Sequence, residues 1–224
     1  MADESKNNVN QQKTLAARLE SIIAFVQNNT KIVSGIGIGI VVIAVVTILM
    51  IRSKRKANKQ ASGKLGIAQM SLQAGDTSNA VVKLENLISR YEGTQSAGYA
   101  LALLGQIESD RGSYQKAQDH FNRYLREYKN KKFITTQVLQ GLGNCLYVSG
   151  NYKEAAQKYE KAARTAPHKF QKHSSLLNAA KCYLETSQIS KSQKLVEEVK
   201  NSSPEKQIKS KLQQIESQIA VKKT

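Results

Sequence analysis

The sequence has 224 residues, with 34 basic and 17 acidic side chains and a formal net charge of +17. It contains only two prolines and no tryptophan, so long helices are nearly uninterrupted and an all-helical fold is predicted. Two cysteines are too few for a disulfide-stabilised scaffold, and they show no zinc-finger spacing with the three histidines, so we expect neither a metal nor another cofactor.

The N-terminal segment, residues 1–31, carries apolar residues at helical spacing: Leu15, Leu19, Ile22 and Val26. This pattern is typical of an amphipathic helix lying at a membrane interface. A weakly ordered tail is the alternative.

Residues 32–51 form an uncharged segment that reads IVSGIGIGIVVIAVVTILMI. Twenty helical residues with a rise of about 1.5 Å each span the roughly 30 Å hydrocarbon core of a bilayer. The pattern therefore predicts a single transmembrane helix rather than a cleaved signal peptide, which is shorter and ends at small residues. Gly35 and Gly39 have the spacing of a helix-dimerisation motif, which makes a homodimer through this helix a hypothesis.

A basic linker, residues 52–60, follows the predicted span. We call its five cations the collar, and they are expected to contact anionic lipid head groups: Arg52, Lys54, Arg55, Lys56 and Lys59. No aromatic residues are interleaved with them to stack on bases, so a nucleic-acid partner is not expected.

Four segments repeat at offsets of 37, 38 and 37 residues, beginning at Gly75, Gly112, Gly150 and Ser187. Each begins at a turn and continues with a small residue and then a large one, four positions apart, as in Ala117 and Phe121. A second column of small residues precedes each turn and permits close approach of two helices: Ala68, Gly105, Gly143 and Ala180. Their neighbours Ile67, Leu104, Leu142 and Ala179 are expected to supply apolar contacts.

The columns predict two helices per repeat, which bury their apolar faces only by stacking into an α-solenoid. The expected repeats are residues 61–97, 98–135, 136–172 and 173–206. A capping helix with a basic tail is expected over residues 207–224, with its apolar positions at Ile208, Leu212, Ile215 and Ile219.

These columns resemble the tetratricopeptide repeat (TPR) over residues 61–206. The family's turn, Gly-x-Tyr-x-x-Ala followed by an aromatic residue, stands at 112–121 and at 150–159, and Pro167 and Pro204 end their repeats. The outer repeats depart from it, because Thr77 and Ile189 replace the turn tyrosine. The resemblance implies a scaffold that binds other proteins.

A partner is expected along the face of each first helix that is turned away from the second helix. Amides and tyrosines there suit hydrogen bonding to a peptide or a helix, and the candidate groove residues are Gln69, Tyr99, Gln106, Asn144, Tyr147 and Lys181. A solvated polar face without a ligand is the alternative. No nucleophile, base and orienting group can be assembled from three histidines and two cysteines, so no enzyme activity is predicted.

Cys145 and Cys182 occupy the same column of adjacent repeats. Equivalent positions on stacked helices lie about 8–10 Å apart, beyond the reach of a disulfide. Both are expected to be free thiols.

The order of a short N-terminal helix, one span, a charged linker and repeats resembles the bacterial family of ancillary subunits of the Sec translocon. That resemblance implies a cytoplasmic-membrane protein with periplasmic repeats that contact the translocon and periplasmic chaperones. The flanking charges favour the opposite orientation, because the collar carries more positive charge than the segment before the span. An envelope structural or assembly protein, linking the membrane to other components, is the alternative function.

Overall fold

The computed structural model describes residue 20 and residues 30–128 and 131–222. Within these residues the chain is all-α, which confirms the predicted fold class at that level. The helices are α2 (Thr30–Gln73), α3 (Thr77–Arg90), α4 (Gln95–Asp110), α5 (Tyr114–Glu127), α6 (Lys132–Val148), α7 (Tyr152–Thr165), α8 (Lys169–Glu185), α9 (Ile189–Asn201) and α10 (Lys206–Val221). The predicted amphipathic helix within residues 1–31 lies almost entirely outside the described residues.

The chain divides into two compact units, residues 1–55 and 56–224, which are described separately. In the first unit, the large apolar side chains of α2 from Val42 to Ile51 are exposed. No helix in the described part of the chain is both long enough and apolar enough to cross a membrane. The predicted span at 32–51 begins in a stretch of α2 whose side chains are not described. Gly35 and Gly39 lie in the same stretch. The span and the pairing of two copies through it stay predictions.

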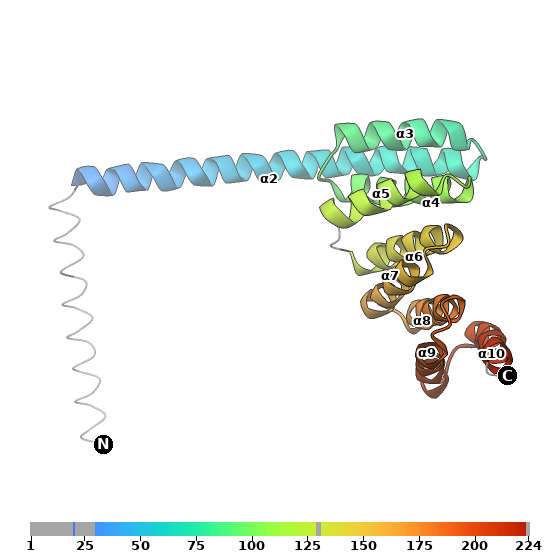
Figure 1. Ribbon diagram of the computed structural model, residues 1–224. Helices are drawn as coiled ribbons and strands as arrows, with labels where there is room; N and C mark the ends of the chain where they lie inside the picture. Colours follow the sequence, from blue (N-terminus) through green and yellow to red (C-terminus); the bar gives the residue numbers. More distant parts are fainter. Residues whose placement is uncertain (1–19, 21–29, 129–130, 223–224) are drawn as a thin grey trace, which may run out of the picture. The chain divides into compact units, whose positions relative to one another are not determined.

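The second unit is a stack of antiparallel helix pairs, α4 with α5, α6 with α7, and α8 with α9, which follow one another in chain order (Figure 1). The predicted columns explain the packing. The small residues Ala80, Ala117, Ala155 and Ser192 and their large partners Leu84, Phe121, Tyr159 and Val196 are all buried. One continuous core joins the C-terminal part of α2 to α8, and a second core joins α7, α8, α9 and α10. The solenoid prediction is therefore confirmed.

Four turns, the one from α2 to α3 and the ones within the three helix pairs, pass through a residue in the left-handed region. Gly75, Gly112 and Gly150 have φ values of 78°, 79° and 79°, and Ser187 occupies the same place with φ 57°. The residue after each of these four donates its backbone N–H to the carbonyl oxygen five residues before it, as Ser113 N does to Glu108 O at 2.8 Å. This bond satisfies a carbonyl at the helix end, and the positive φ explains why glycine recurs there.

Ile67 departs from its column. Leu104, Leu142 and Ala179 are buried as predicted, but Ile67 is 47% exposed. The physical reason is the solenoid geometry, since each later first helix is covered by the pair before it, whereas no helix pair precedes α2 in the part of the chain that the structure describes. The expectation of an apolar contact at Ile67 was wrong.

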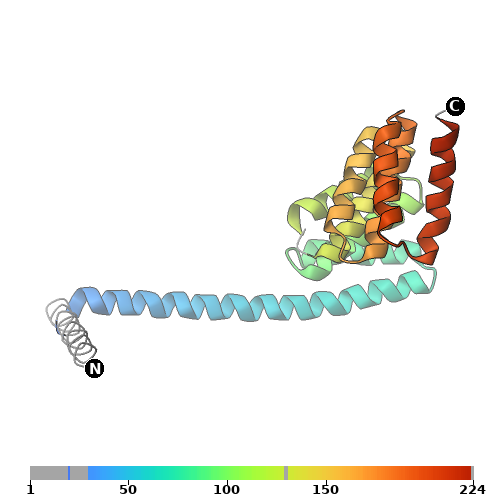
Figure 2. The same cartoon turned by 90° about the horizontal axis from the view of Figure 1, so that it is seen from below.

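The C-terminal end is closed by α10, as predicted, and Figure 2 shows this helix at the end of the stack. Ile208, Leu212, Ile215 and Ile219 are buried against α8 and α9. A buried histidine holds the connection from α9 to α10. His173 of α8 places Nδ1 2.9 Å from Glu205 Oε2 and Nε2 2.8 Å from Ser202 Oγ.

Replacing Ser187 by glycine is expected to stabilise the fold. A side chain in the left-handed region costs about 1 kcal/mol, and S187G removes that cost at a position where the other three repeats carry glycine. The measurement is denaturant unfolding followed by far-UV circular dichroism. G150S provides the reverse control and should lower the unfolding free energy by a similar amount. A loss of stability in S187G contradicts the interpretation.

Candidate functional site

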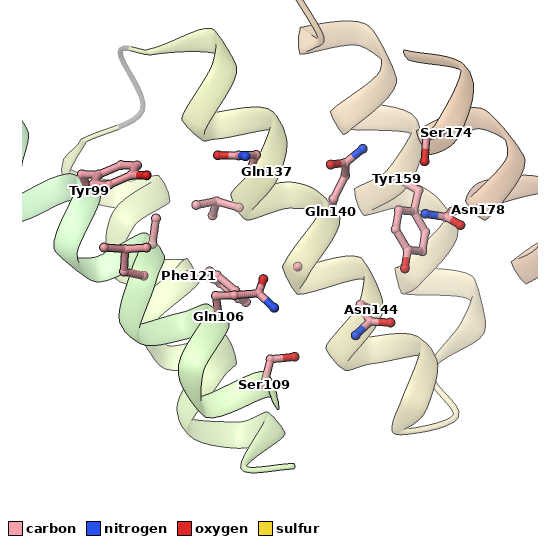
Figure 3. Close-up of a pocket in the computed structure, with 14 residues that line it drawn as sticks. Tyr99, Gln106, Ser109, Phe121, Gln137, Gln140, Asn144, Tyr159, Ser174 and Asn178 are labelled. Atoms are coloured by element: carbon pink, nitrogen blue, oxygen red, sulfur yellow. The ribbon is translucent and has the colours of Figure 1, made fainter. Parts of the chain in front are cut away.

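A hollow of about 470 Å³ lies along the first helices of three successive pairs, α4, α6 and α8 (Figure 3). We call it the groove. Its lining comprises Tyr99, Ala102, Leu103, Gln106 and Ser109 from α4, Gln137, Val138, Gln140, Gly141 and Asn144 from α6, Ser174 and Asn178 from α8, and Phe121 and Tyr159 from the second helices. None of these side chains carries a charge at neutral pH.

Helical spacing explains why these residues share one face. On α6 the lining residues Gln137, Gln140, Gly141 and Asn144 are three, four and seven positions apart, so they fall on one side of the helix. The same spacing joins Tyr99 to Gln106 on α4. Stacking of the helix pairs then places the three faces side by side.

The floor of the groove depends on an aromatic ring held between two glycines. A Cβ on Gly105 of α4 would lie 2.4 Å from Phe121 Cε1, and one on Gly141 of α6 would lie 2.6 Å from Phe121 Cζ. The ring of Phe121 is 2% exposed. Tyr159 contacts Gly143 in the same way in the next repeat, where an added Cβ would lie 2.9 Å from Cε1. Only glycine lets the helices approach these rings so closely.

Some polar groups of the groove already have partners. Gln140 Nε2 donates to Ser175 Oγ at 2.7 Å, and Gln106 Nε2 donates to Asp110 Oδ1 at 2.8 Å. Asn178 Oδ1 accepts a hydrogen bond from Lys211 Nζ of α10. These bonds fix the orientation of side chains along the walls.

Other polar groups have no such partner. Within the described ranges, the side chains of Tyr99, Gln137, Asn144 and Ser174 make no hydrogen bond with the protein. Gln137 and Asn144 are exposed, and Tyr99 and Ser174 are partly buried. Amides offer both donors and acceptors, so the groove presents unused hydrogen-bonding capacity of both kinds.

The structure brings together three of the six candidate groove residues. Tyr99, Gln106 and Asn144 line the groove, and Gln69, Tyr147 and Lys181 do not. Gln69 lies on α2, which contributes no residue to the lining.

Tyr147 and Lys181 are engaged with each other and with neighbours. Tyr147 donates to Glu185 Oε1 at 2.9 Å, and Lys181 Nζ lies 4.6 Å from the centroid of the Tyr147 ring. Burial and the Glu185 carboxylate together raise the pKa of Tyr147 to about 12. The tyrosine therefore remains a neutral donor at physiological pH, and this trio is a contact between adjacent repeats.

Sequence reasoning missed part of the groove, namely Gln137, Gln140, Gly141, Ser174 and Asn178. A signal was present, since Tyr99, Gln137 and Ser174 recur at the repeat offsets of 38 and 37 residues. They form an aligned column two turns before Gln106, Asn144 and Lys181. Tracing this column as well as the one at Asn144 would have added Gln137 and Ser174 to the candidate residues.

The two cysteines are free and buried, which confirms the prediction for them. Burial raises the pKa of Cys145, and it raises the pKa of Cys182 to about 12. Because the thiolate is the reactive form, both thiols are poor nucleophiles at neutral pH. The described residues also contain no group of three or more histidine, cysteine, aspartate or glutamate side chains placed to hold a metal ion.

All five collar residues lie on α2 and are exposed: Arg52, Lys54, Arg55, Lys56 and Lys59. Their exposure leaves these cations accessible to lipid head groups.

Two family models for the tetratricopeptide repeat match the sequence, over residues 65–131 and 136–169. The chain therefore contains tetratricopeptide repeats, in agreement with the resemblance drawn from the turns at Gly112 and Gly150. Such repeats generally serve as scaffolds that bind other proteins. A comparison with curated protein sequences found no match.

Solved structures share the fold at low sequence identity. The MamA RS-1 ArsTM double mutant matches with 16% identity and a TM-score of 0.55, over 73% of this chain and 94% of that one. The yeast histone chaperone Hif1, described as a scaffold protein recruiting protein complexes to core histones, matches with 11% identity and a TM-score of 0.56, over 76% and 98%. Pseudomonas aeruginosa pilF matches with 17% identity and a TM-score of 0.52, over 74% and 78%. These likenesses concern the fold alone.

Adding a methyl group at Gly105 is expected to damage the floor of the groove. G105A places a carbon against the Phe121 ring, which Gly141 confines on its other side, so the unfolding free energy should fall by about 1–3 kcal/mol. Denaturant unfolding measures the change.

Gly66 of α2 provides the matched control, because a Cβ there has nothing within 4 Å. G66A should raise stability by about 0.5–1 kcal/mol through helix propensity alone. F121L should relieve the G105A cost in a double-mutant cycle. Equal effects of G105A and G66A contradict the close packing.

Proposed function

We propose that this protein is a membrane-anchored scaffold that holds an uncharged, extended segment of another protein in the groove between α4, α6 and α8. The observation that carries the proposal is the neutral groove of a chain with net charge +17, in which Gln137, Asn144 and two other polar side chains have no hydrogen-bond partner among the described residues. A binding surface for an acidic ligand would concentrate the abundant cations, and this one excludes them.

The chemistry of the lining favours a peptide backbone as the ligand. Gln137 and Asn144 are two turns apart on α6, about 10 Å at a rise of 1.5 Å per residue. An extended peptide covers that distance in about three residues, and its N–H and C=O groups match the donors and acceptors of the amides. Tyr99 and Leu103 add apolar surface for a side chain.

Photocrosslinking in the native membrane tests the groove. A photoreactive residue at Asn144 should give adducts with another protein, and one at Lys161, exposed on α7, should not. Because the lining is neutral, the adducts should persist at high salt, where exposed charge contacts are screened. Adducts at Lys161 but not at Asn144 contradict the proposal.

The captured partner then allows an affinity measurement. The double variant Q137A/N144A removes two amide groups and is expected to weaken binding about tenfold, at about 0.5–1.5 kcal/mol per hydrogen bond. Q115A/Q157A is the matched control, since both glutamines are exposed on the second helices α5 and α7. It should leave binding unchanged.

We further propose that residues 32–51 anchor the chain in a bacterial cytoplasmic membrane, with the repeats on the extracytoplasmic side. The uncharged run and the collar support an anchor. The order of segments favours the Sec translocon and periplasmic chaperones as partners, and Gly35 with Gly39 would pair two copies. A structural role in the envelope predicts instead that binding of the repeats is lost at high salt.

The membrane side can be tested without removing the native thiols, because Cys145 and Cys182 are buried. In the variant K161C, a membrane-impermeant thiol reagent should label the new cysteine in intact cells. Protection in intact cells with labelling after lysis rejects the extracytoplasmic orientation. The unsubstituted chain should show no labelling in either sample.

A further inference from the structure

A second pocket, of about 240 Å³, lies between α2 and α3 within the unit formed by residues 56–224. It is lined by Lys64 and Ile67 from α2, and by Lys83, Asn86, Leu87, Arg90 and Tyr91 on or next to α3. The α3 residues Lys83, Asn86, Leu87 and Arg90 are three, four and seven positions apart, so one face of that helix forms a wall.

Positive charge dominates this pocket. Its lining holds three cations and no carboxylate. Lys83 Nζ donates to the hydroxyl of Ser71 at 2.7 Å. Lys64 and Arg90 are exposed and make no ion pair with any described residue. Asp76 lies near Lys83, but its carboxylate caps α3 through Asn79 N at 3.1 Å.

Several other cations of the repeat unit form local ion pairs. Arg123 pairs with Glu92 at 3.1 Å, Lys172 with Glu198 at 2.9 Å and Lys200 with Glu216 at 2.9 Å. Unlike these three cations, Lys64, Lys83 and Arg90 line one pocket whose lining contains no carboxylate.

Apolar side chains accompany the charge. Two residues of the lining are aliphatic: Leu87 is buried, and Ile67 is 47% exposed. On the same two helices Met70 is 67% exposed and Val82 is 54% exposed. Among the described residues no helix pair precedes α2 to cover them, whereas α10 covers the last pair at the C-terminal end. An exposed apolar surface bordered by polar groups marks an interaction site.

We propose that this pocket binds an anionic phospholipid, a phosphate ester that carries apolar chains. Arg90 and the two lysines supply the donors that phosphate oxygens accept, and Ile67, Leu87 and Tyr91 contact the apolar part. This site is distinct from the groove and from the collar, and it stands whether or not residues 32–51 span a membrane.

The test uses the full chain in a non-ionic detergent and a short-chain phosphatidylglycerol, the dihexanoyl form, below its critical micelle concentration. Isothermal titration calorimetry at fixed salt should show binding. K64Q/R90Q removes two exposed cations and should weaken it about tenfold, because charge-assisted hydrogen bonds are lost. K116Q/R126Q, on exposed positions of α5, changes the net charge equally and should leave the affinity within about twofold.

Titrations with other ligands test whether the pocket prefers an anionic lipid. Short-chain phosphatidylcholine, which has no net charge, should bind at least about tenfold more weakly than phosphatidylglycerol. Inorganic phosphate binding as tightly as the lipid would overturn the lipid assignment, as would an acidic peptide that binds in its place. Lipid binding that K64Q/R90Q leaves unchanged, or an absence of lipid binding, would overturn the site. Unchanged thermal unfolding of both variants would show that the fold is intact.

Discussion

The contact on which the structure depends is the ring of Phe121 held between the backbones of α4 and α6. Gly105 and Gly141 leave room for it, and an added Cβ at either position would lie well inside van der Waals distance of the ring. The same arrangement recurs between Gly143 and Tyr159. Because core packing tolerates little change in volume, this contact sets how closely successive helix pairs stack, and therefore where the faces of the first helices meet.

The groove follows directly from that stacking. Gly141 contacts the Phe121 ring and also lines the groove, so the packing and the candidate binding surface share a residue. Its neighbours Gln137 and Asn144 have hydrogen-bonding groups without a partner among the described residues. Tyr147 and Lys181 instead contact each other across adjacent repeats, and Tyr147 also donates to Glu185. The closely packed floor is fixed before binding, so only the amide side chains above it have to be ordered when a peptide binds.

The two ends of the solenoid are chemically different. At the C-terminal end, α10 covers the last pair with four buried aliphatic side chains, and His173 secures the connection before it. At the other end no described helix pair precedes α2, and Ile67 is exposed in the pocket that Lys64 and Arg90 also line. Within the described residues, α10 covers the C-terminal end of the stack, and α2 and α3 line an apolar, positively charged pocket at the other.

The sequence by itself determined the repeat period, the turns at Gly75, Gly112 and Gly150, the capping helix and the free thiols. Those features follow from local conformation and from positions that recur at a constant offset, and both can be read along one chain. Tertiary structure alone decided that Gly141 receives the Phe121 ring, that Tyr147 turns to Glu185, and that Ile67 is uncovered. Periodicity tells which residues share a face of a helix, but which faces meet, and at what distance, is set by packing between helices.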